Sequence, residues 1–322
     1  MRAIRVHQTG GPEVLTVEDI ATPQPQAAQV LVRVAAAGVN FIDIYHRTGL
    51  YKLPLPFTPG GEAAGTVESV GPGVDAVKPG DRVTYVGPPG SYAEFAVVPA
   101  SVLLPVPPGL DLKLAAAAML QGMTAHYLVH SVYPLKQGDT CLVHAAAGGT
   151  GRIIVQMAKM LGARVIGTTS TEEKAEEARR CGADETILYT SQDFEVEARR
   201  ITDGRGVDVV YDSVGKTTWD KSLNCLRLRG MMVSFGNASG AVDPIAPLIL
   251  NQKGSLFLTR PKLQDYIASP DELQWRAGDV LNWVASGKLD LKLDGEYSLD
   301  QAGQAHEDLA SRKTSGKLLL VP

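Results

Sequence analysis

The spacing of hydrophobic residues changes twice along the chain. Up to about residue 125, β-branched or alternating runs such as "QVLVRVAAAGV" (29–39) and "SYAEFAVV" (91–98) are separated by turns rich in Gly and Pro, including "KPGDRV" (78–83). Alternation between dense turn signals is typical of antiparallel sheet. We therefore predict a β-rich first domain, either barrel-like or a twisted sheet.

From about residue 126, short apolar runs alternate with segments of helical pattern. We predict six strands here: "TCLVHAA" (140–146), "ARVIGTT" (163–169), "ETILY" (185–189), "VDVVYDSVG" (207–215), "GMMVSFG" (230–236) and "GSLFLT" (254–259). The helices between them are expected at 151–161, 170–183, 193–202 and 217–227, the second with a serine cap. Strands that alternate with helices build βαβ units, and six of them match the doubly wound nucleotide-binding fold. The fold class is therefore α/β with a doubly wound parallel sheet.

The last third of the chain returns to short segments. A polar helix with two tryptophans is expected near 270–286, and the chain ends in "GKLLLVP" (316–322). We expect this tail to rejoin the first domain. The predicted domains are then 1–125 plus 260–322, with 126–259 as an inserted nucleotide-binding domain.

Composition and charge exclude several classes of function. The net charge of −4 gives no electrostatic basis for binding nucleic acid or an anionic membrane. The uncharged run 114–135 contains a glutamine, two histidines and a proline, so it is expected to form a buried helix at a domain junction. The three cysteines include no C-x-x-C pair, which excludes a disulfide framework and favours a reducing cytoplasm.

The stretch "HAAAGGTGR" (144–152) follows a predicted strand and opens a helix. It is a degenerate G-x-G-x-x-G pattern, with alanine at the first glycine and Gly148, Gly149, Thr150 and Gly151 after it. Glycines let the backbone approach a pyrophosphate, and a helix N-terminus supplies free N–H groups. The sequence therefore predicts a dinucleotide site. Arg152, in the first helical turn, could be a surface charge or a phosphate contact, and a surface charge is favoured.

The end of the second strand distinguishes NADH from NADPH. An NAD enzyme usually carries Asp or Glu there to bind the ribose 2′-hydroxyl. Here residues 168–171 read Thr-Thr-Ser-Thr, Lys174 follows, and Tyr189 ends the third strand. Hydroxyl groups and a lysine suit a 2′-phosphate, which an acidic side chain would repel. The predicted cofactor is NADPH.

The segment "PFTPGGEAAGTVESV" (56–70) has the frame P-G-x-E-x-x-G-x-V, which alcohol dehydrogenases use to hold catalytic zinc. Those enzymes have a histidine where this chain has Gly61, and no cysteine precedes Cys141. Catalytic zinc needs three protein ligands. The sequence therefore predicts no metal, and the remaining histidines, His144 among them, are expected to be hydrogen-bonded structural residues. Without a Lewis acid, an acceptor such as a quinone or an enone is favoured over an alcohol substrate.

The chain resembles the bacterial NADPH:quinone oxidoreductases. The resemblance runs along the whole sequence and is carried by "GVNFIDIYHRTGLY" (38–51), "HAAAGGTG" (144–151), "YDSVGKTTWDKSLNCLRLRGMMVSFGNASG" (211–240) and "LNQKGSLFLTRP" (250–261). These proteins are zinc-free medium-chain dehydrogenases/reductases, close to zeta-crystallins. The resemblance implies a GroES-like catalytic domain that contains an inserted Rossmann domain. It also implies a homodimer that pairs the last Rossmann strand, near 254–259, across a two-fold axis.

The resemblance also implies site residues. Asn40, Phe41 and Tyr45 would border the nicotinamide and the quinone, and Asn40 and Tyr45 are the predicted catalytic residues. The cofactor would contact the remaining residues, which are Tyr127, Gly148, Gly149, Thr150, Ser170, Thr171, Lys174, Tyr189, Val214, Phe235, Gly236, Asn237 and Arg312.

The predicted activity is metal-free reduction of quinones by NADPH at the cleft between the domains. Two alternatives stay open. An enone or enal reductase on the same scaffold would turn over α,β-unsaturated carbonyl compounds faster than quinones. A non-catalytic, NADPH-gated binding protein would bind the cofactor without consuming any acceptor.

Overall fold

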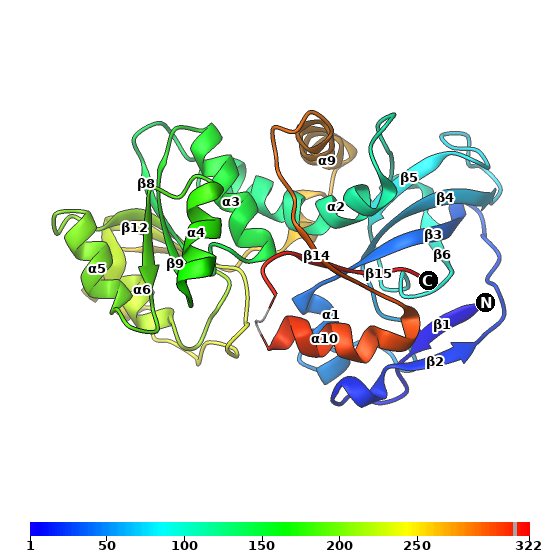
Figure 1. The fold of residues 1–322 in the computed structure, drawn as a ribbon, viewed down its shortest axis with the longest axis horizontal. Coiled ribbons are helices and arrows are strands. Elements are labelled where there is room, and N and C mark those ends of the chain that lie inside the picture. The colour runs from blue at the N-terminus through cyan, green and yellow to red at the C-terminus, as the bar shows by residue number, and fades with distance from the viewer. Residues whose placement is uncertain (312–313) are drawn as a thin grey trace. The chain divides into compact units, whose positions relative to one another are not determined.

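The structure is a computed structural model that describes residues 1–311 and 314–322. The chain divides into two compact units (Figure 1): Met1–Leu120 with Ser269–Pro322 form the first, and Gln121–Ala268 form the second. The domain division expected from the sequence, with boundaries at 125/126 and 259/260, stays a prediction.

The first unit is built on a seven-stranded sheet. Its strands follow the order β14-β15-β3-β4-β5-β7, and β6 also pairs with β3. Their bounds are β3 (Gln29–Val39), β4 (Glu62–Val70), β5 (Arg82–Val86), β6 (Phe95–Pro99), β7 (Leu103–Pro105), β14 (Leu293–Tyr297) and β15 (Lys317–Leu320). All pairs are antiparallel except β14 with β15. A separate ribbon pairs β1 (Arg2–Arg5) with β2 (Thr16–Asp19).

The long strand β3 organises the core of this unit. Val30, Val32 and Val34 alternate along the strand and are buried in one cluster with Tyr85 of β5, whereas Arg33 between them is exposed. This period of two buries one face of the sheet. The C-terminal strand β15 lies beside β3 (Leu319 opposite Gly38), so the expected return of the tail to the first sheet is confirmed.

Helices and short helical turns complete the first unit. They are η1 (Pro12–Val14), α1 (Phe41–Thr48), η2 (Ala100–Val102), α9 (Pro270–Ala285), η4 (Leu299–Gln301) and α10 (Ala302–Ala310). Helix α2 (Leu112–Tyr127) begins in this unit and continues into the second unit beyond Leu120. The uncharged run 114–135 forms most of α2, in which Ala115–Met119 are buried, and the π-helical turn η3 (Leu128–Val132) of the second unit. Of the helices in the described part of the chain, none is long and apolar enough to cross a membrane.

The second unit contains a six-stranded, fully parallel sheet of order β10-β9-β8-β11-β12-β13. Numbered within the unit this order is 3-2-1-4-5-6, which is that of the doubly wound dinucleotide fold. The predicted α/β fold class is confirmed. The strands are β8 (Thr140–Val143), β9 (Arg164–Thr169), β10 (Glu185–Leu188), β11 (Val207–Asp212), β12 (Leu226–Ser234) and β13 (Phe257–Thr259).

The helices of the second unit cover both faces of its sheet. Their bounds are α3 (Gly149–Met160), α4 (Glu172–Arg180), α5 (Phe194–Ile201), α6 (Trp219–Cys225), α7 (Leu248–Gln252) and α8 (Leu263–Tyr266). Helices α3 and α4 lie on one side, and α5 and α6 lie on the other (Figure 1). This arrangement leaves the carboxyl ends of the strands at one edge of the sheet, where ligands bind in folds of this kind.

One predicted cap is wrong. The N-cap of α4 is Thr171 and not Ser170, because the Thr171 hydroxyl accepts a hydrogen bond from the backbone N–H of Lys174 at 3.3 Å. Threonine caps a helix nearly as well as serine, so the "ST" pair alone did not distinguish the two positions. The glycine that follows this helix, Gly182, has φ +107°, consistent with the predicted stop.

Candidate functional site

The glycine-rich turn of the second unit lies between β8 and α3. Ala145 has φ +52°, and its carbonyl accepts a hydrogen bond from Gly148 N at 2.8 Å. A Cβ on Gly151 would lie 2.1 Å from that same carbonyl oxygen, so no other residue fits there. The first N–H groups of α3 have no helical acceptor and lie at the positive end of the helix dipole. The residues present therefore fit a dinucleotide phosphate.

Arg152 in the first turn of α3 is not a surface charge, and that expectation is wrong. The residue is 3% exposed, and its guanidinium Nη1 lies 2.9 Å from Oε1 of the buried Glu177 in α4. The partner carboxylate is what makes burial of the arginine possible. The pair links α3 to α4.

His144, at the end of β8, is a buried hydrogen-bonded histidine, as expected. Its Nδ1 lies 2.9 Å from the Thr168 hydroxyl on β9, and its Nε2 lies 2.9 Å from the Ser222 hydroxyl on α6. Ser222 in turn donates to Asp212 Oδ2 at 3.1 Å. Burial lowers the pKa of His144 and favours the neutral ring. The ring thus joins three elements beneath the carboxyl edge of the sheet.

Ser170, Thr171, Lys174 and Tyr189 lie at the carboxyl ends of β9 and β10. Thr169 pairs with Leu188 in the ladder, and beyond them the Thr190 hydroxyl donates to Ser170 O at 3.0 Å. The hydrogen bond that caps α4 fixes Lys174 relative to Thr171. The structure therefore brings the predicted 2′-phosphate residues to one edge, but their contact with a cofactor stays a prediction.

The loops after β11 and β12 pack against each other at the same sheet edge. Asp212 Oδ1 accepts hydrogen bonds from the backbone N–H groups of Val214 (2.7 Å) and Gly215 (2.9 Å). A Cβ on Gly236 would lie 2.3 Å from Ser213 O, so glycine is what allows this approach. Val214 is thereby brought close to the Phe235–Gly236–Asn237 segment, as the expected cofactor path requires.

A further predicted cofactor contact, Tyr127, lies away from these loops. Tyr127 near the end of α2 is 2% exposed, and its ring stacks on Tyr266 with centroids 4.5 Å apart. Its cofactor role stays a prediction. Arg312 lies outside the described residues.

In the first unit, the predicted substrate-contacting residues lie at the start of α1. Asn40 precedes this helix, and Phe41 and Tyr45 follow on it, half-buried, with ring centroids 6.2 Å apart. The rings of Tyr51 and Tyr45 pack edge to face, with their centroids 5.3 Å apart. The helix therefore carries a group of aromatic rings directly after Asn40.

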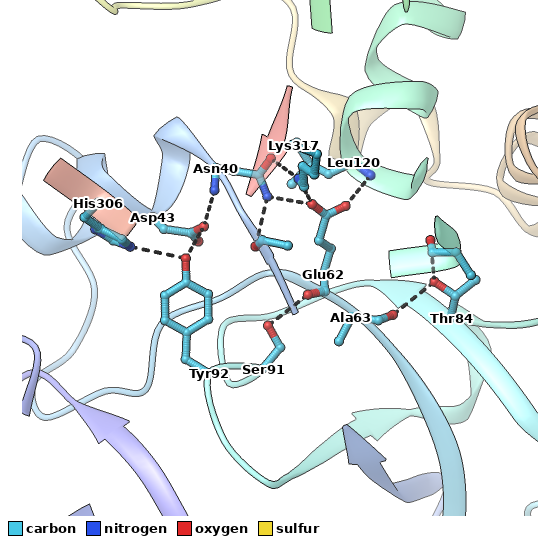
Figure 2. Close-up of polar contacts among 12 residues, drawn as sticks. Asn40, Asp43, Glu62, Ala63, Thr84, Ser91, Tyr92, Leu120, His306 and Lys317 are labelled. Atoms are coloured by element: carbon cyan, nitrogen blue, oxygen red, sulfur yellow. Dashed lines mark hydrogen bonds and ion pairs between the residues drawn. The ribbon is translucent and has the colours of Figure 1, made fainter. Parts of the chain in front are cut away.

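The Asn40 side chain belongs to a buried polar cluster (Figure 2). Its Nδ2 donates to Glu62 Oε1 at 2.8 Å and to Gly38 O at 3.3 Å, and its Oδ1 accepts from Lys317 Nζ at 2.7 Å. Lys317 also forms an ion pair with Glu62 Oε1. Asn40 and Lys317 are each 3% exposed, and Glu62 is fully buried. Both amide N–H groups of Asn40 are therefore committed within the protein, and its predicted contact with ligands stays a prediction.

A second buried chain of hydrogen bonds runs from α1 to α10 (Figure 2). Asp43 Oδ2 accepts from Asn40 N at 2.9 Å and from the Tyr92 hydroxyl at 3.0 Å. His306 lies 3.2 Å from the Tyr92 hydroxyl through Nε2, and 3.2 Å from Arg47 Nη1 through Nδ1. Because arginine only donates, a neutral His306 accepts at Nδ1 and donates from Nε2 to Tyr92.

Burial determines the charge states of Asp43 and His306 in this chain of hydrogen bonds. It raises the pKa of Asp43 to about 7, and the hydrogen bonds from Asn40 and Tyr92 offset only part of that effect. Burial and the nearby Arg47 charge lower the pKa of His306 to about 3, so this ring is neutral at physiological pH. The helix that carries Tyr45 is therefore tied to α10 through a carboxyl group that titrates near neutrality.

Sequence reasoning missed Glu62, Lys317 and His306 as members of the site. Glu62 and Lys317 were visible as single charged residues at the start of otherwise apolar segments, "EAAGTV" and "KLLLVP". A charged residue there requires a buried partner, since an unpaired charge inside a protein is very costly. That signal could have identified both residues, but not that they pair with each other.

The residues around Gly61 do not fit a catalytic metal. A Cβ at Gly61 would lie 3.4 Å from Gly87 O, which is ordinary contact, so a side chain could be accommodated but none is present. Within residues 1–311 and 314–322, no group of three or more His, Cys, Asp or Glu side chains could hold a metal ion. Lys317 Nζ instead supplies the positive charge beside Glu62.

Family models match both halves of this architecture. The model of the alcohol dehydrogenase GroES-like domain matches residues 26–108, and that of the zinc-binding dehydrogenases matches residues 149–272. A GroES-like sheet together with a doubly wound dinucleotide sheet defines a medium-chain dehydrogenase/reductase.

Comparison with individual proteins narrows the class. The chain is 46% identical to a quinone oxidoreductase of Pseudomonas aeruginosa, over 97% of each chain, and 46% identical to a 2-haloacrylate reductase of a Burkholderia species, over 98% of each. Its structure matches that of Escherichia coli quinone oxidoreductase complexed with NADPH, with a TM-score of 0.98, 44% identity and full coverage of both chains. The chain belongs to the quinone oxidoreductase family.

Proposed function

We propose that this protein reduces quinones with NADPH and without a metal. The observation that carries the proposal is that the chain is 46% identical to a quinone oxidoreductase over nearly its full length. After β9 the chain has hydroxyl residues and Lys174, and it lacks the acidic residue that would repel a 2′-phosphate. The solved Escherichia coli relative, 44% identical, is complexed with NADPH. Gly61 lacks a side chain where a zinc-dependent relative would need a ligand.

The proposed cofactor site lies at the carboxyl edge of the parallel sheet. Gly148, Gly149 and Thr150 would hold the pyrophosphate through backbone N–H groups at the start of α3. Positive charge and hydroxyl groups would hold the 2′-phosphate, and the loops after β11 and β12, which Gly236 allows to pack against each other, would line the rest of the cofactor path. The 2′-phosphate residues are Ser170, Thr171, Lys174 and Tyr189. The remaining proposed contacts are Tyr127, Val214, Phe235, Asn237 and Arg312.

The proposed substrate residues are on and next to α1. NADPH supplies a hydride when it is bound. Phe41 and Tyr45 would orient the flat quinone ring by stacking, because two planar π-systems pack well at offset geometry. The Tyr45 hydroxyl, or a water bound to it, would donate a hydrogen bond to a quinone oxygen and pass the proton that the reduced product requires. Asn40 would fix the start of this helix.

Steady-state oxidation of NADPH and NADH, with a small quinone, a bulky quinone and an enone as acceptors, tests the proposal. We expect quinone turnover with NADPH to be clearly faster than with NADH. Tyr45→Phe should lower kcat with quinones by about 10-fold or more if its hydroxyl assists proton transfer. Tyr51→Phe is the matched control. Absence of turnover with every quinone would contradict the proposal.

The 2-haloacrylate reductase relative favours one alternative function, reduction of an activated carbon–carbon double bond, because the chain is as similar to it as to the Pseudomonas aeruginosa protein. An α,β-unsaturated acid or carbonyl compound would then have a higher kcat/KM than any quinone in the same assay. A non-catalytic binding protein would instead bind NADPH tightly and consume no acceptor. The three outcomes are mutually distinguishable in one set of measurements.

A homodimer is also proposed, through the edge strand β13. This strand ends the parallel sheet, and large apolar side chains are exposed on or near it. They are Phe257 (57% exposed) and Leu258 (36%) on β13 and Leu228 (72%) on the adjacent strand β12. An unpaired edge with apolar side chains is suited to pairing with a second copy. Sedimentation should give a dimer that Phe257→Asp converts to monomer, whereas Val196→Asp, at an exposed apolar residue on α5, should not.

We further propose a cytoplasmic location. The three cysteines are free, and Cys141 and Cys225 are buried, so the fold has no disulfide that an oxidising compartment would have to form. Cell fractionation tests this proposal, and recovery with periplasmic or membrane fractions would contradict it.

A further inference from the structure

Glu62 and Lys317 form the most deeply buried ion pair of the first unit. The side chains are 0% and 3% exposed, and they come from the starts of β4 and β15. A buried pair is rarely worth its desolvation cost as a source of stability, since well-packed apolar residues do as well or better. By contrast, Arg33 and Glu68, on β3 and β4, form an exposed pair. The buried charges therefore call for a role other than stability.

The surrounding chain leaves space for this pair. A Cβ on Gly38 would lie 2.0 Å from Glu62 Oε1 and 2.7 Å from Lys317 Cε. Glycine on β3 is thus the residue that admits both side chains. The same strand continues to Asn40, so the pair lies directly beside the segment that leads into α1.

The Glu62–Lys317 pair forms hydrogen bonds with residues of α2 and at the start of α1. Glu62 Oε2 accepts a hydrogen bond from Leu120 N of α2 at 2.6 Å, while Oε1 accepts from Asn40 Nδ2 (Figure 2). Lys317 Nζ donates to Asn40 Oδ1. Both ends of the Asn40 amide are therefore specified: one by a carboxylate, the other by an ammonium. An amide held in this way cannot flip.

We propose that Lys317 is a positioning residue of the quinone-reducing site: its ammonium, held by Glu62, fixes the Asn40 amide and thereby the start of α1, which carries Phe41 and Tyr45. This inference rests on the proposed function. Positioning matters because a reacting group displaced by a fraction of an ångström loses much of its rate advantage.

Four variants separate positioning from mere stability. Lys317→Met leaves a buried carboxylate without its cation. Glu62→Leu with Lys317→Met replaces the pair by apolar groups of similar volume, which restores charge balance but leaves Asn40 without either partner. Asn40→Ala removes the amide itself. Arg33→Met with Glu68→Gln removes the exposed pair from the neighbouring strands and is the matched control.

The measurements are kcat and KM with NADPH and a quinone, NADPH affinity, and the midpoint of thermal unfolding between about pH 5 and 8. Lys317→Met should lower kcat by roughly 10-fold or more. Its unfolding midpoint should fall with rising pH more steeply than that of the wild type, because a buried carboxylate without its cation is stable only when protonated. The other titratable groups that face Glu62 are Asp43 on α1 and Tyr92.

The apolar double variant decides the question. We expect it to unfold at a higher midpoint than Lys317→Met, below that of the wild type because Asn40 and Leu120 N lose hydrogen bonds, and to lose the extra pH dependence of Lys317→Met. It should nevertheless keep the low kcat, with unchanged NADPH affinity. Recovery of kcat would overturn the proposal and leave the pair a purely structural role. If the double variant does not fold, a further variant that combines Asn40→Ala with Lys317→Met is compared with the two single variants for its effect on kcat. Non-additive effects support positioning, and additive effects contradict it.

The same measurements distinguish failure of the proposed quinone reduction from failure of the inference on Lys317. In that case the wild-type protein itself would reduce no quinone, and the positioning role would fall with it. A wild-type protein that reduces quinones, together with an apolar double variant as active as wild type, would overturn only the inference on Lys317.

Discussion

The two units build their sites from different chemistry. At the edge of the parallel sheet, backbone N–H groups and glycines such as Gly151 and Gly236 form a surface that the main chain itself shapes. In the first unit, the candidate site is organised by the buried charged and polar side chains of Glu62, Lys317 and Asn40. A backbone site tolerates little added volume. A site of buried charges is sensitive both to added volume and to loss of a single charge.

The largest effect is expected at the backbone site. Gly151→Val would place its side chain against Ala145 O, which a Cβ already approaches to 2.1 Å, so the turn must open. We expect loss of detectable NADPH binding, measured by fluorescence titration, because the N–H groups at the start of α3 are displaced. Gly278→Val is the control, since Gly278 lies within α9, its φ is not positive, and a Cβ there meets nothing within 4 Å. Normal NADPH binding by Gly151→Val would contradict the backbone account.

A smaller effect is expected at the 2′-phosphate end. Lys174→Ala removes one cation and should weaken NADPH binding by about 10-fold, as for a hydrogen bond to a charged group, and leave NADH binding unchanged. The readout is the ratio of the two dissociation constants. Lys136→Ala, at an exposed lysine of the same unit, should not change that ratio. A parallel loss for both cofactors would show that Lys174 does not recognise the phosphate.

The buried charges of the first unit predict a pH dependence. The folded-state pKa of Asp43, about 7, lies above the value of about 3.9 for an exposed aspartate. The folded protein therefore binds more protons between these values, and the free energy of unfolding should fall as pH rises from about 4 to about 7. Asp43→Asn should flatten this slope in urea unfolding. Asp75→Asn, at an exposed site, should retain it. An unchanged slope in Asp43→Asn would exclude Asp43 as its source.

The smallest effect concerns a glycine with no role in either site. Gly278 lies within α9, lacks a positive φ, and a Cβ there would meet nothing within 4 Å. Gly278→Ala should raise the free energy of unfolding by up to about 1 kcal/mol through helix propensity, with kcat unchanged. Destabilisation would indicate a close contact that the structure does not contain.

The second unit could be predicted from sequence because its signals are local. Each strand and helix has its own period, and the glycine turn occupies consecutive residues between β8 and α3. The cap of α4 and the burial of Arg152 escaped prediction. The first depends on a choice between adjacent hydroxyl residues, and the second depends on Glu177, 25 positions away in another helix.

The cluster around Asn40 could not be predicted for a related reason. Asn40 is 22 residues from Glu62 and 277 from Lys317, and only the register of β15 on β3 brings them together. A single sequence shows that a charge lies in an apolar strand but not which strand will lie beside it. The lack of a metal ligand at position 61 could be recognised without knowing the fold, because glycine has no side chain to bind a metal in any structure.

The central claim is that quinones are reduced by NADPH without a metal. Its most direct test is the steady-state rate of NADPH oxidation with a quinone, measured in chelator on protein assayed for zinc. We predict undiminished turnover by protein that contains no stoichiometric zinc. Turnover that disappears in chelator and returns with added zinc would contradict the account, because a metal would then do the work assigned here to Lys317, Asn40 and the residues of α1.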